Sequence, residues 1–249
     1  MRCSRLWQFL LFLQGARNQV RLSVPMTHLF LWLGMASLAF GLFIKITDEV
    51  FEDAKVDAID KALLIVVAKC RASWLNGAMV DLSALGSPTL VVLLSALALV
   101  LFLLTGDRFG ALQVLVTSVG AGFWTVLTKS LIERARPEVV PRLVEVSGSS
   151  YPSGHALLAA SMYLMLAILA CRHFSSVGAR VTLLAIATTV IGLVSISRLY
   201  LGVHYPSDIA SGISLGAAWT LLLAGGFSFI TAHPLSSLEK KERRSSHRL

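Results

Sequence analysis

The sequence predicts an all-α, polytopic membrane protein in which six transmembrane helices form a bundle. Of its 249 residues, 55% are hydrophobic and only 14% are charged, whereas about 25% are charged in a typical globular domain. The mean hydropathy is +0.74. So few charges could not cover the surface of a water-soluble domain of this length. The same composition excludes a disordered chain and a disulfide-stapled secreted scaffold.

Six apolar segments are long enough, or nearly so, to cross the hydrocarbon core as helices, which takes about 17–25 residues. Ser87 and Pro88 form a helix-start signal in the second segment, since serine is a good N-cap and proline fits the first turn. The fourth and fifth segments are short, so we expect neighbouring residues to extend them. The six segments cover residues 29–44, 82–106, 109–128, 156–171, 181–197 and 209–232.

Between the first two spans, residues 48–71 predict an amphipathic helix. Its apolar side chains recur at helical spacing: Val56, Ile59, Leu63 and Val66. Charged side chains lie on the opposite face: Asp53, Asp57, Asp60 and Lys61. A helix with two such faces is typical of a membrane interface, and we expect this one to lie at the outer interface.

The chain divides into an N-terminal cytoplasmic or interfacial segment (1–28), a transmembrane domain (29–232) and a basic cytoplasmic tail (233–249). Residues 6–13 form an apolar run, but no cleavage site of small residues follows it and Arg17 interrupts the pattern. These features disfavour a signal peptide. An interfacial helix is favoured there, and a true start at Met26 is the alternative.

The distribution of charge among the loops predicts the orientation. The two termini and the loops after the second and fourth spans hold twelve Lys or Arg and three Asp or Glu, whereas the rest of the chain holds ten and eleven. The positive-inside rule therefore places both termini in the cytoplasm and the loops after the first, third and fifth spans outside. This topology, with attraction to anionic lipid, explains the basic tail without nucleic acid.

Two polar motifs flank the loop after the third span. Lys129 and Arg136 are seven residues apart near the end of that span, about two helical turns, so both cations can share one face. Pro137 then ends the helix. Pro152-Ser153-Gly154-His155 opens the fourth span, where free backbone N–H groups form a ready anion site.

A third motif joins the fifth and sixth spans. Arg198 ends one helix, and His204 and Asp208 are four residues apart, so the carboxylate can bond one imidazole nitrogen. Because the loops after the third and fifth spans share one membrane face, we expect all three motifs to meet in one outward-facing pocket. Its cations and helix terminus suit a tetrahedral dianion, and its histidines can act as nucleophile and general acid. Asp208 is the one acid among the defining positions of the motifs, so no metal or other cofactor is expected.

Together the three motifs resemble the signature of the type 2 phosphatidic acid phosphatase superfamily: Lys129-x6-Arg136-Pro137, Pro152-Ser153-Gly154-His155 and Ser197-Arg198-x5-His204-x3-Asp208. The resemblance implies that His204 attacks phosphorus and forms a phosphohistidine, with Asp208 orienting its ring. His155 would protonate the departing lipid oxygen and then activate water. The phosphate oxygens would be held by five further residues: Lys129, Arg136, Ser153, Gly154 and Arg198.

The resemblance implies an integral membrane lipid phosphatase whose substrate is a phosphate or diphosphate monoester. Undecaprenyl diphosphate, phosphatidylglycerophosphate and phosphatidate are the candidate substrates. The short chain without an Asn-x-Ser/Thr sequence fits a bacterial inner-membrane enzyme whose site faces the periplasm. Three alternatives stay open: a vanadate-dependent peroxidase-like enzyme, a non-catalytic lipid-binding or transport protein, and a phosphatase of water-soluble esters. The sequence does not predict the oligomeric state.

Two further sets of residues carry structural expectations. Charged residues of the segment 133–145 are expected to lie solvated at the rim of the pocket: Glu133, Arg134, Glu138, Arg142 and Glu145. Glycines of the third span are expected to permit close helix packing: Gly110, Gly120 and Gly122.

Overall fold

The computed structural model describes residues 26–232, which form eight α-helices and no strand. The expectations for residues 1–25 and 233–249 lie outside the described residues. The helices are α2 (Met26–Glu52), α3 (Ala54–Lys69), α4 (Ser73–Ala84), α5 (Pro88–Leu104), α6 (Arg108–Leu131), α7 (Gly154–Cys171), α8 (Val177–Tyr200) and α9 (Pro206–Ala232).

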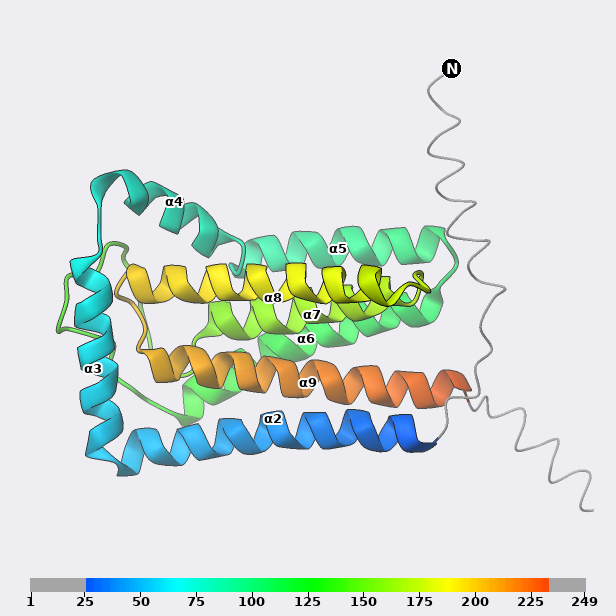
Figure 1. The fold of residues 1–249 in the computed structure, drawn as a ribbon, viewed down its shortest axis with the longest axis horizontal. Coiled ribbons are helices and arrows are strands. Elements are labelled where there is room, and N and C mark those ends of the chain that lie inside the picture. The colour runs from blue at the N-terminus through cyan, green and yellow to red at the C-terminus, as the bar shows by residue number, and fades with distance from the viewer. Residues whose placement is uncertain (1–25, 233–249) are drawn as a thin grey trace, which may run out of the picture.

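The long helices run along a common direction as one bundle, while α3 crosses one end of it and α4 slopes from α3 back to α5 (Figure 1). Helix α7 lies inside the bundle, in contact with α5, α6, α8 and α9, and α2 packs along α9. The segment 132–153 has no helix and lies at the same end as α3. That end therefore gathers the loops in which the three sequence motifs lie.

Five described helices are long and apolar enough to cross a membrane: α2, α6, α7, α8 and α9. Helices α4 and α5 pass the same test together, bent by 46° at their junction, and would make a sixth span if they are one broken span. As expected, α7 and α8 extend beyond their apolar cores. The predicted segment 82–106 comprises the end of α4, a turn and α5, and α5 begins at the expected Ser87-Pro88 signal.

The start of α5 follows the sequence signal. Pro88 is its first residue, and the Ser87 hydroxyl accepts a hydrogen bond from the Leu90 amide at 3.3 Å. The preceding turn depends on Gly86, where a Cβ atom would lie 2.8 Å from the carbonyl oxygen of His155. The break in the span therefore brings the backbone of this turn directly against the start of α7.

Helix α3 confirms the predicted helix between the first two spans, but its faces are distributed differently. Ile59 and Val66 are 58% and 56% exposed, so the apolar face points away from the protein. Asp60, which the pattern groups with the charged face, is only 2% exposed. Burial of this carboxylate has a local cause, since Arg134 and Ser207 both bond to it.

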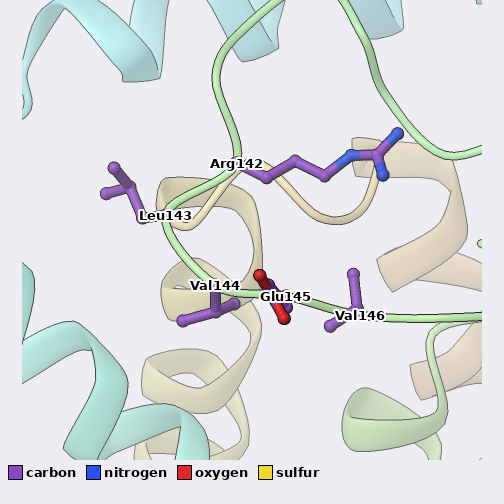
Figure 2. A pocket seen from close by; sticks show the side chains of 5 residues that line it. All are labelled: Arg142, Leu143, Val144, Glu145 and Val146. Carbon is purple, nitrogen blue, oxygen red and sulfur yellow. The ribbon is translucent and has the colours of Figure 1, made fainter.

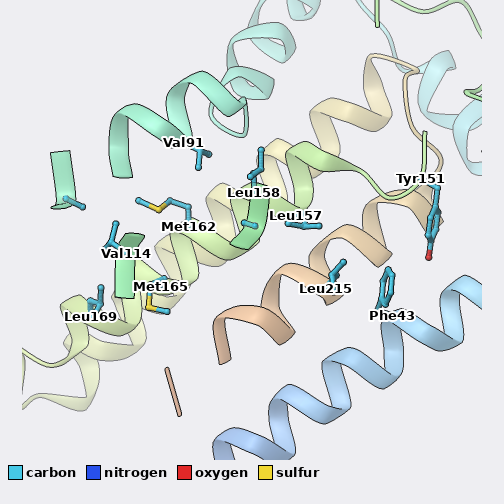
Figure 3. Close-up of a cluster of buried hydrophobic side chains, with 12 residues drawn as sticks. Phe43, Val91, Val114, Tyr151, Leu157, Leu158, Met162, Met165, Leu169 and Leu215 are labelled. Atoms are coloured by element: carbon cyan, nitrogen blue, oxygen red, sulfur yellow. The ribbon is translucent and has the colours of Figure 1, made fainter. Parts of the chain in front are cut away.

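The hydrophobic core is centred on α7. Side chains from α2, α5, α6 and α9 surround it, as Figure 3 shows. Helix α9 approaches α7 closely because Cβ atoms at Gly212 and Gly216 would lie 2.5 Å from the carbonyl oxygens of Ser153 and Leu157. Small residues spaced four apart permit such backbone contact between membrane helices.

Two of the three glycines of α6 lie in close packing contacts, as expected, and the third does not. A Cβ atom at Gly120 would collide with the indole of Trp219, whose Nε1 donates to the Thr117 carbonyl at 3.2 Å. Gly110 lies against Phe102 and its own capping residue, Asp107. At Gly122 a Cβ atom would meet no other element within 4 Å among residues 26–232, so for Gly122 the expectation was wrong.

Candidate active site

The three motifs meet at the end of the bundle that α3 crosses. Helix α6 ends there, α7 and α9 begin there, and α8 ends in the short loop that carries His204. The backbone joins two of the motifs directly, because the amide of Ser153 donates to the carbonyl of Asp208 at 2.9 Å. The expectation that the loops after the third and fifth spans bring the three motifs together is therefore correct.

His204 and Asp208 form a buried pair, with exposures of 2% and 0%. The distance between His204 Nδ1 and Asp208 Oδ2 is 3.5 Å, slightly beyond a hydrogen bond. Nδ1 has no hydrogen-bond partner among residues 26–232, whereas Oδ2 accepts from the Tyr205 amide at 2.8 Å. Catalytic hydrogen bonds are often long before substrate binds, and a small rotation of the imidazole would close this one.

Burial determines the charge of His204. It lowers the pKa of the imidazole to about 4, and the neighbouring carboxylate of Asp208 only partly opposes this effect. The ring is therefore neutral at pH 7. A neutral imidazole has the free lone pair that a nucleophile requires.

The cations of the motifs differ in how they are held. The Arg136 guanidinium donates to the carbonyl oxygens of Gly148 at 2.9 Å, Val203 at 2.9 Å and Ser147 at 3.0 Å, and Lys129 Nζ donates to the Ser149 carbonyl. These bonds join the segment 132–153 to the His204 loop and to α6. Both cations are thereby fixed by backbone oxygens that leave their positive charge uncompensated.

Arg198 is held from α4 instead. Its guanidinium is 4% exposed, and Nη1 donates to the Ser83 hydroxyl at 2.7 Å. Its Nε has no hydrogen-bond partner within the described part of the chain. This buried cation therefore retains a donor that a ligand can use.

The N-terminus of α7 adds a further unpaired group. Ser153 is the N-cap and is fully buried, yet its hydroxyl caps no amide and bonds to no other group of residues 26–232. Gly154 places the start of α7 close to α6, because a Cβ there would lie 3.0 Å from Thr125 Cγ2 and 3.7 Å from Lys129 Cε. His155 follows and interacts electrostatically with Lys129, Arg198 and His204.

All eight predicted site residues thus gather at one place, and three of them bear a buried polar atom that has no hydrogen-bond partner among the described residues. These atoms are Ser153 Oγ, Arg198 Nε and His204 Nδ1. Leaving a buried polar group unpaired costs about 1–3 kcal/mol, so a folded protein rarely keeps several together without a use. Two donors and an imidazole beside three cations suit an oxyanion.

Comparison with known proteins identifies the family. The family model described as PAP2 superfamily, the type 2 phosphatidic acid phosphatases, matches residues 110–230, which include all three motifs. Phosphatidylglycerophosphatase B of Bacillus subtilis is 33% identical over 186 residues, which cover 74% of this chain and 91% of that protein. The chain belongs to the PAP2 superfamily. The resemblance carried by the motifs is thereby confirmed.

Other PAP2 proteins agree. The crystal structure of the first transmembrane PAP2 type phosphatidylglycerolphosphate phosphatase from Bacillus subtilis matches with a TM-score of 0.72 and 29% identity, covering 78% of this chain and 96% of that chain. Decaprenylphosphoryl-5-phosphoribose phosphatase of Mycobacterium tuberculosis is 36% identical over 95 residues, which cover 37% of this chain and 47% of that protein. With its apolar helices, this PAP2 chain is an integral membrane phosphatase.

Sequence reasoning missed residues that bond to the predicted site residues. Arg134 was expected to be solvated at the rim; this was wrong, because its side chain is 11% exposed and forms ion pairs with Asp60 and Asp208. Ser83 also escaped notice, since nothing in its local sequence indicates a bond to Arg198. A single sequence carries no signal for either contact, because both join segments far apart along the chain.

The segment 142–146 forms a separate hollow of about 430 Å³ at the rim, lined by its own five residues (Figure 2). None of the predicted site residues lines it. The segment is held against the His204 loop, because the Leu143 amide donates to the Leu201 carbonyl at 3.0 Å and Val144 packs beside Val203. It therefore covers the loop that carries His204 without forming part of the PAP2 site.

We expect Ser83→Ala to lower kcat/KM for phosphate release by about tenfold, since a hydrogen bond to a charged group contributes about 1.5–3 kcal/mol. Arg198 would lose the partner that fixes its guanidinium. The measurement is steady-state kinetics of the purified protein. Ser228→Ala is the matched control, because within the described part of the chain that hydroxyl bonds only to the Ala224 carbonyl on its own helix; equal kinetics for both variants would contradict the role of Ser83.

Proposed function

We propose that this PAP2 enzyme hydrolyses a phosphate or diphosphate monoester of a membrane lipid through a phosphohistidine on His204. The observation that carries the proposal is the group of three unpaired buried polar atoms beside Lys129, Arg136 and Arg198. Phosphatidylglycerophosphate, undecaprenyl diphosphate and phosphatidate are the candidate substrates. The name of the 33% identical relative favours phosphatidylglycerophosphate as the first to test.

In the first step, His204 attacks phosphorus and the bond from phosphorus to the lipid oxygen breaks. Because Nδ1 is the nitrogen beside Asp208, the attacking nitrogen is Nε2. The carboxylate stabilises the positive charge that develops on the ring. His155 donates its proton to the departing oxygen, so the lipid leaves as a neutral alcohol or as a lipid monophosphate.

In the second step, His155 accepts a proton from water, and the resulting hydroxide attacks the phosphohistidine. The bond from phosphorus to Nε2 breaks, releasing phosphate and restoring neutral His204. In both steps Lys129, Arg136 and Arg198 stabilise the charge on the three equatorial oxygens. The Ser153 hydroxyl and the Gly154 amide at the start of α7 supply neutral donors to the same oxygens.

We further propose that residues 29–232 form one transmembrane phosphatase domain, with α4 and α5 as a broken sixth span. The site would face the periplasm of a bacterial inner membrane, with both termini in the cytoplasm. The bias of Lys and Arg toward the opposite loops supports this orientation. The outward-facing apolar side chains of α3 support its place at the outer interface, level with the site.

The test is a panel of substrates in detergent micelles: the three candidate lipids, and p-nitrophenyl phosphate as a water-soluble ester. We expect phosphate release from at least one lipid, an unchanged rate in EDTA, and inhibition by vanadate without peroxidase activity. Loss of activity on chelation would contradict the mechanism. Lipid binding without turnover would indicate a non-catalytic protein, and a preference for the soluble ester would contradict a lipid substrate.

A further inference from the structure

A buried chain of charged side chains extends from the catalytic pair to α3. The Arg134 guanidinium donates from Nη1 to Asp208 Oδ1 at 2.6 Å and from Nη2 to Asp60 Oδ2 at 2.9 Å. The three side chains are 11%, 0% and 3% exposed, respectively. Ion pairs on a protein surface contribute little, whereas a buried pair becomes very costly when one partner is removed.

In this charge chain, the two oxygens of the Asp208 carboxylate have different partners. Oδ2 lies toward His204 and accepts from the Tyr205 amide, while Oδ1 is occupied by Arg134. Arg134 therefore fixes the rotation of the carboxylate and keeps Oδ2 directed at the imidazole. The ring of Tyr205, 4.3 Å from the guanidinium carbon, covers one face of Arg134.

Asp60 fixes Arg134 and the start of α9 together. Its Oδ1 accepts from the Ser207 amide at 3.0 Å, and its Oδ2 accepts from the Ser207 hydroxyl as well as from Arg134. Ser207 immediately precedes Asp208, and Arg134 also donates to the Ser207 hydroxyl at 2.8 Å. A single carboxylate of α3 thus determines where both Arg134 and the first turn of α9 lie.

We infer that Arg134 and Asp60 are positioning residues for the phosphoryl-transfer step, acting on His204 through Asp208. This inference rests on the proposed function. Arg134 occupies one of the unspecified x6 positions of the first motif, and Asp60 lies outside the segment 110–230 that the family model matches. The expected effect is on kcat, because the charge chain orients the nucleophile and does not touch the phosphate.

The charge of Arg134 also affects the pH dependence of activity, in a direction that can be predicted. Arg134 is a cation beside the His204–Asp208 pair. Its removal therefore raises the pKa of the pair, and the acid limb of the plot of activity against pH moves to higher pH. Removal of the Asp60 anion cannot move it upward. The other titratable or charged groups around the pair come from α6, α7, α8 and the adjoining loops: Lys129, His155, Arg198, Arg136, Tyr151 and Tyr205.

The test compares Arg134→Gln, Arg134→Lys and Asp60→Asn on phosphatidylglycerophosphate micelles, or on whichever panel lipid the wild type hydrolyses fastest. Misplacement of a reacting group lowers rates by about 100-fold, and we expect this loss of kcat for Arg134→Gln with little change in KM. Arg134→Lys should recover part of it, and Asp60→Asn should lose about tenfold. The acid limb of Arg134→Gln should move up by about one pH unit.

Two matched controls separate these effects from a general loss of charge. Arg142→Gln removes a cation of the same segment that bonds to the Pro137 carbonyl, and Asp57→Asn removes a half-exposed acid of α3 paired with Lys61. Both should keep wild-type kcat. In an Asp208→Asn background, Arg134→Gln should cause no further loss, because residues that act through a shared partner are not additive.

Wild-type kcat in Arg134→Gln and Asp60→Asn would overturn the inference while leaving the proposed function intact. So would an undiminished Arg134→Gln effect in the Asp208→Asn background, which would indicate direct contact with the phosphate. If Arg134→Gln does not fold, the isosteric Asp60→Asn and the charge-conserving Arg134→Lys decide the matter by the same kinetics. A wild type that releases no phosphate from any lipid would overturn the proposed function and this inference with it.

Discussion

A His204→Ala variant should fold, bind lipid and release no phosphate, with kcat reduced by at least about 10⁴-fold, as when the nucleophile of a covalent mechanism is removed. The side chain is 2% exposed, and its Nδ1 has no hydrogen-bond partner within residues 26–232. The substitution therefore removes the attacking atom, Nε2, without breaking a hydrogen bond at Nδ1. Asp208, Arg134 and the three cations keep their backbone and side-chain partners.

The measurement uses lipid carrying radiolabelled terminal phosphate and rapid quenching. Wild-type protein should carry an acid-labile label on its chain during turnover, and His204→Ala should carry none. His173→Ala is the matched control, since that histidine follows α7 at the opposite end of the bundle. Label on the His204→Ala chain, or its turnover at a rate close to that of the wild type, would place the nucleophile elsewhere.

The second large effect is expected for Gly212→Leu, which should separate α9 from α7 and eliminate activity. A Cβ atom there would lie 2.5 Å from the Ser153 carbonyl oxygen and 3.3 Å from the Leu157 amide nitrogen. Backbone atoms cannot move aside as a flexible side chain can, so overpacking here should cost about 3 kcal/mol. Displacement of α9 would also break the bond from the Ser153 amide to the Asp208 carbonyl, which joins two motifs.

Thermal unfolding in detergent, followed together with phosphate release, measures both consequences. Gly226→Leu is the control on the same helix, because among residues 26–232 no atom beyond its own stretch of helix lies within 4 Å of its Cβ position, and it should unfold near the wild-type temperature. A Gly212→Leu protein as stable and as active as the Gly226→Leu protein would contradict the close packing of α7 and α9.

The sequence predicted those parts of the molecule that depend on neighbouring residues. Runs of apolar side chains located α6 to α9, the N-cap signal at Ser87 located the start of α5, and loop parity grouped the motifs. It did not predict α4, the helix that meets α5 at a bend of 46°, since its N-cap, Ala72, carries no capping side chain. Burial of Asp60 and Arg134 also escaped prediction, because each charge is compensated by a partner about 74 residues away.

The break between α4 and α5 and the inward carboxylate of α3 have a consequence for where the catalytic unit begins. The family model matches from residue 110 onward, yet Asp60, Ser83 and Gly86 contact Arg134, Arg198 and His155 from earlier in the chain. A protein truncated to residues 110–230 would retain every signature residue while losing the groups that bond to Arg134 and Arg198. We therefore expect the smallest functional fragment to include α3 and α4.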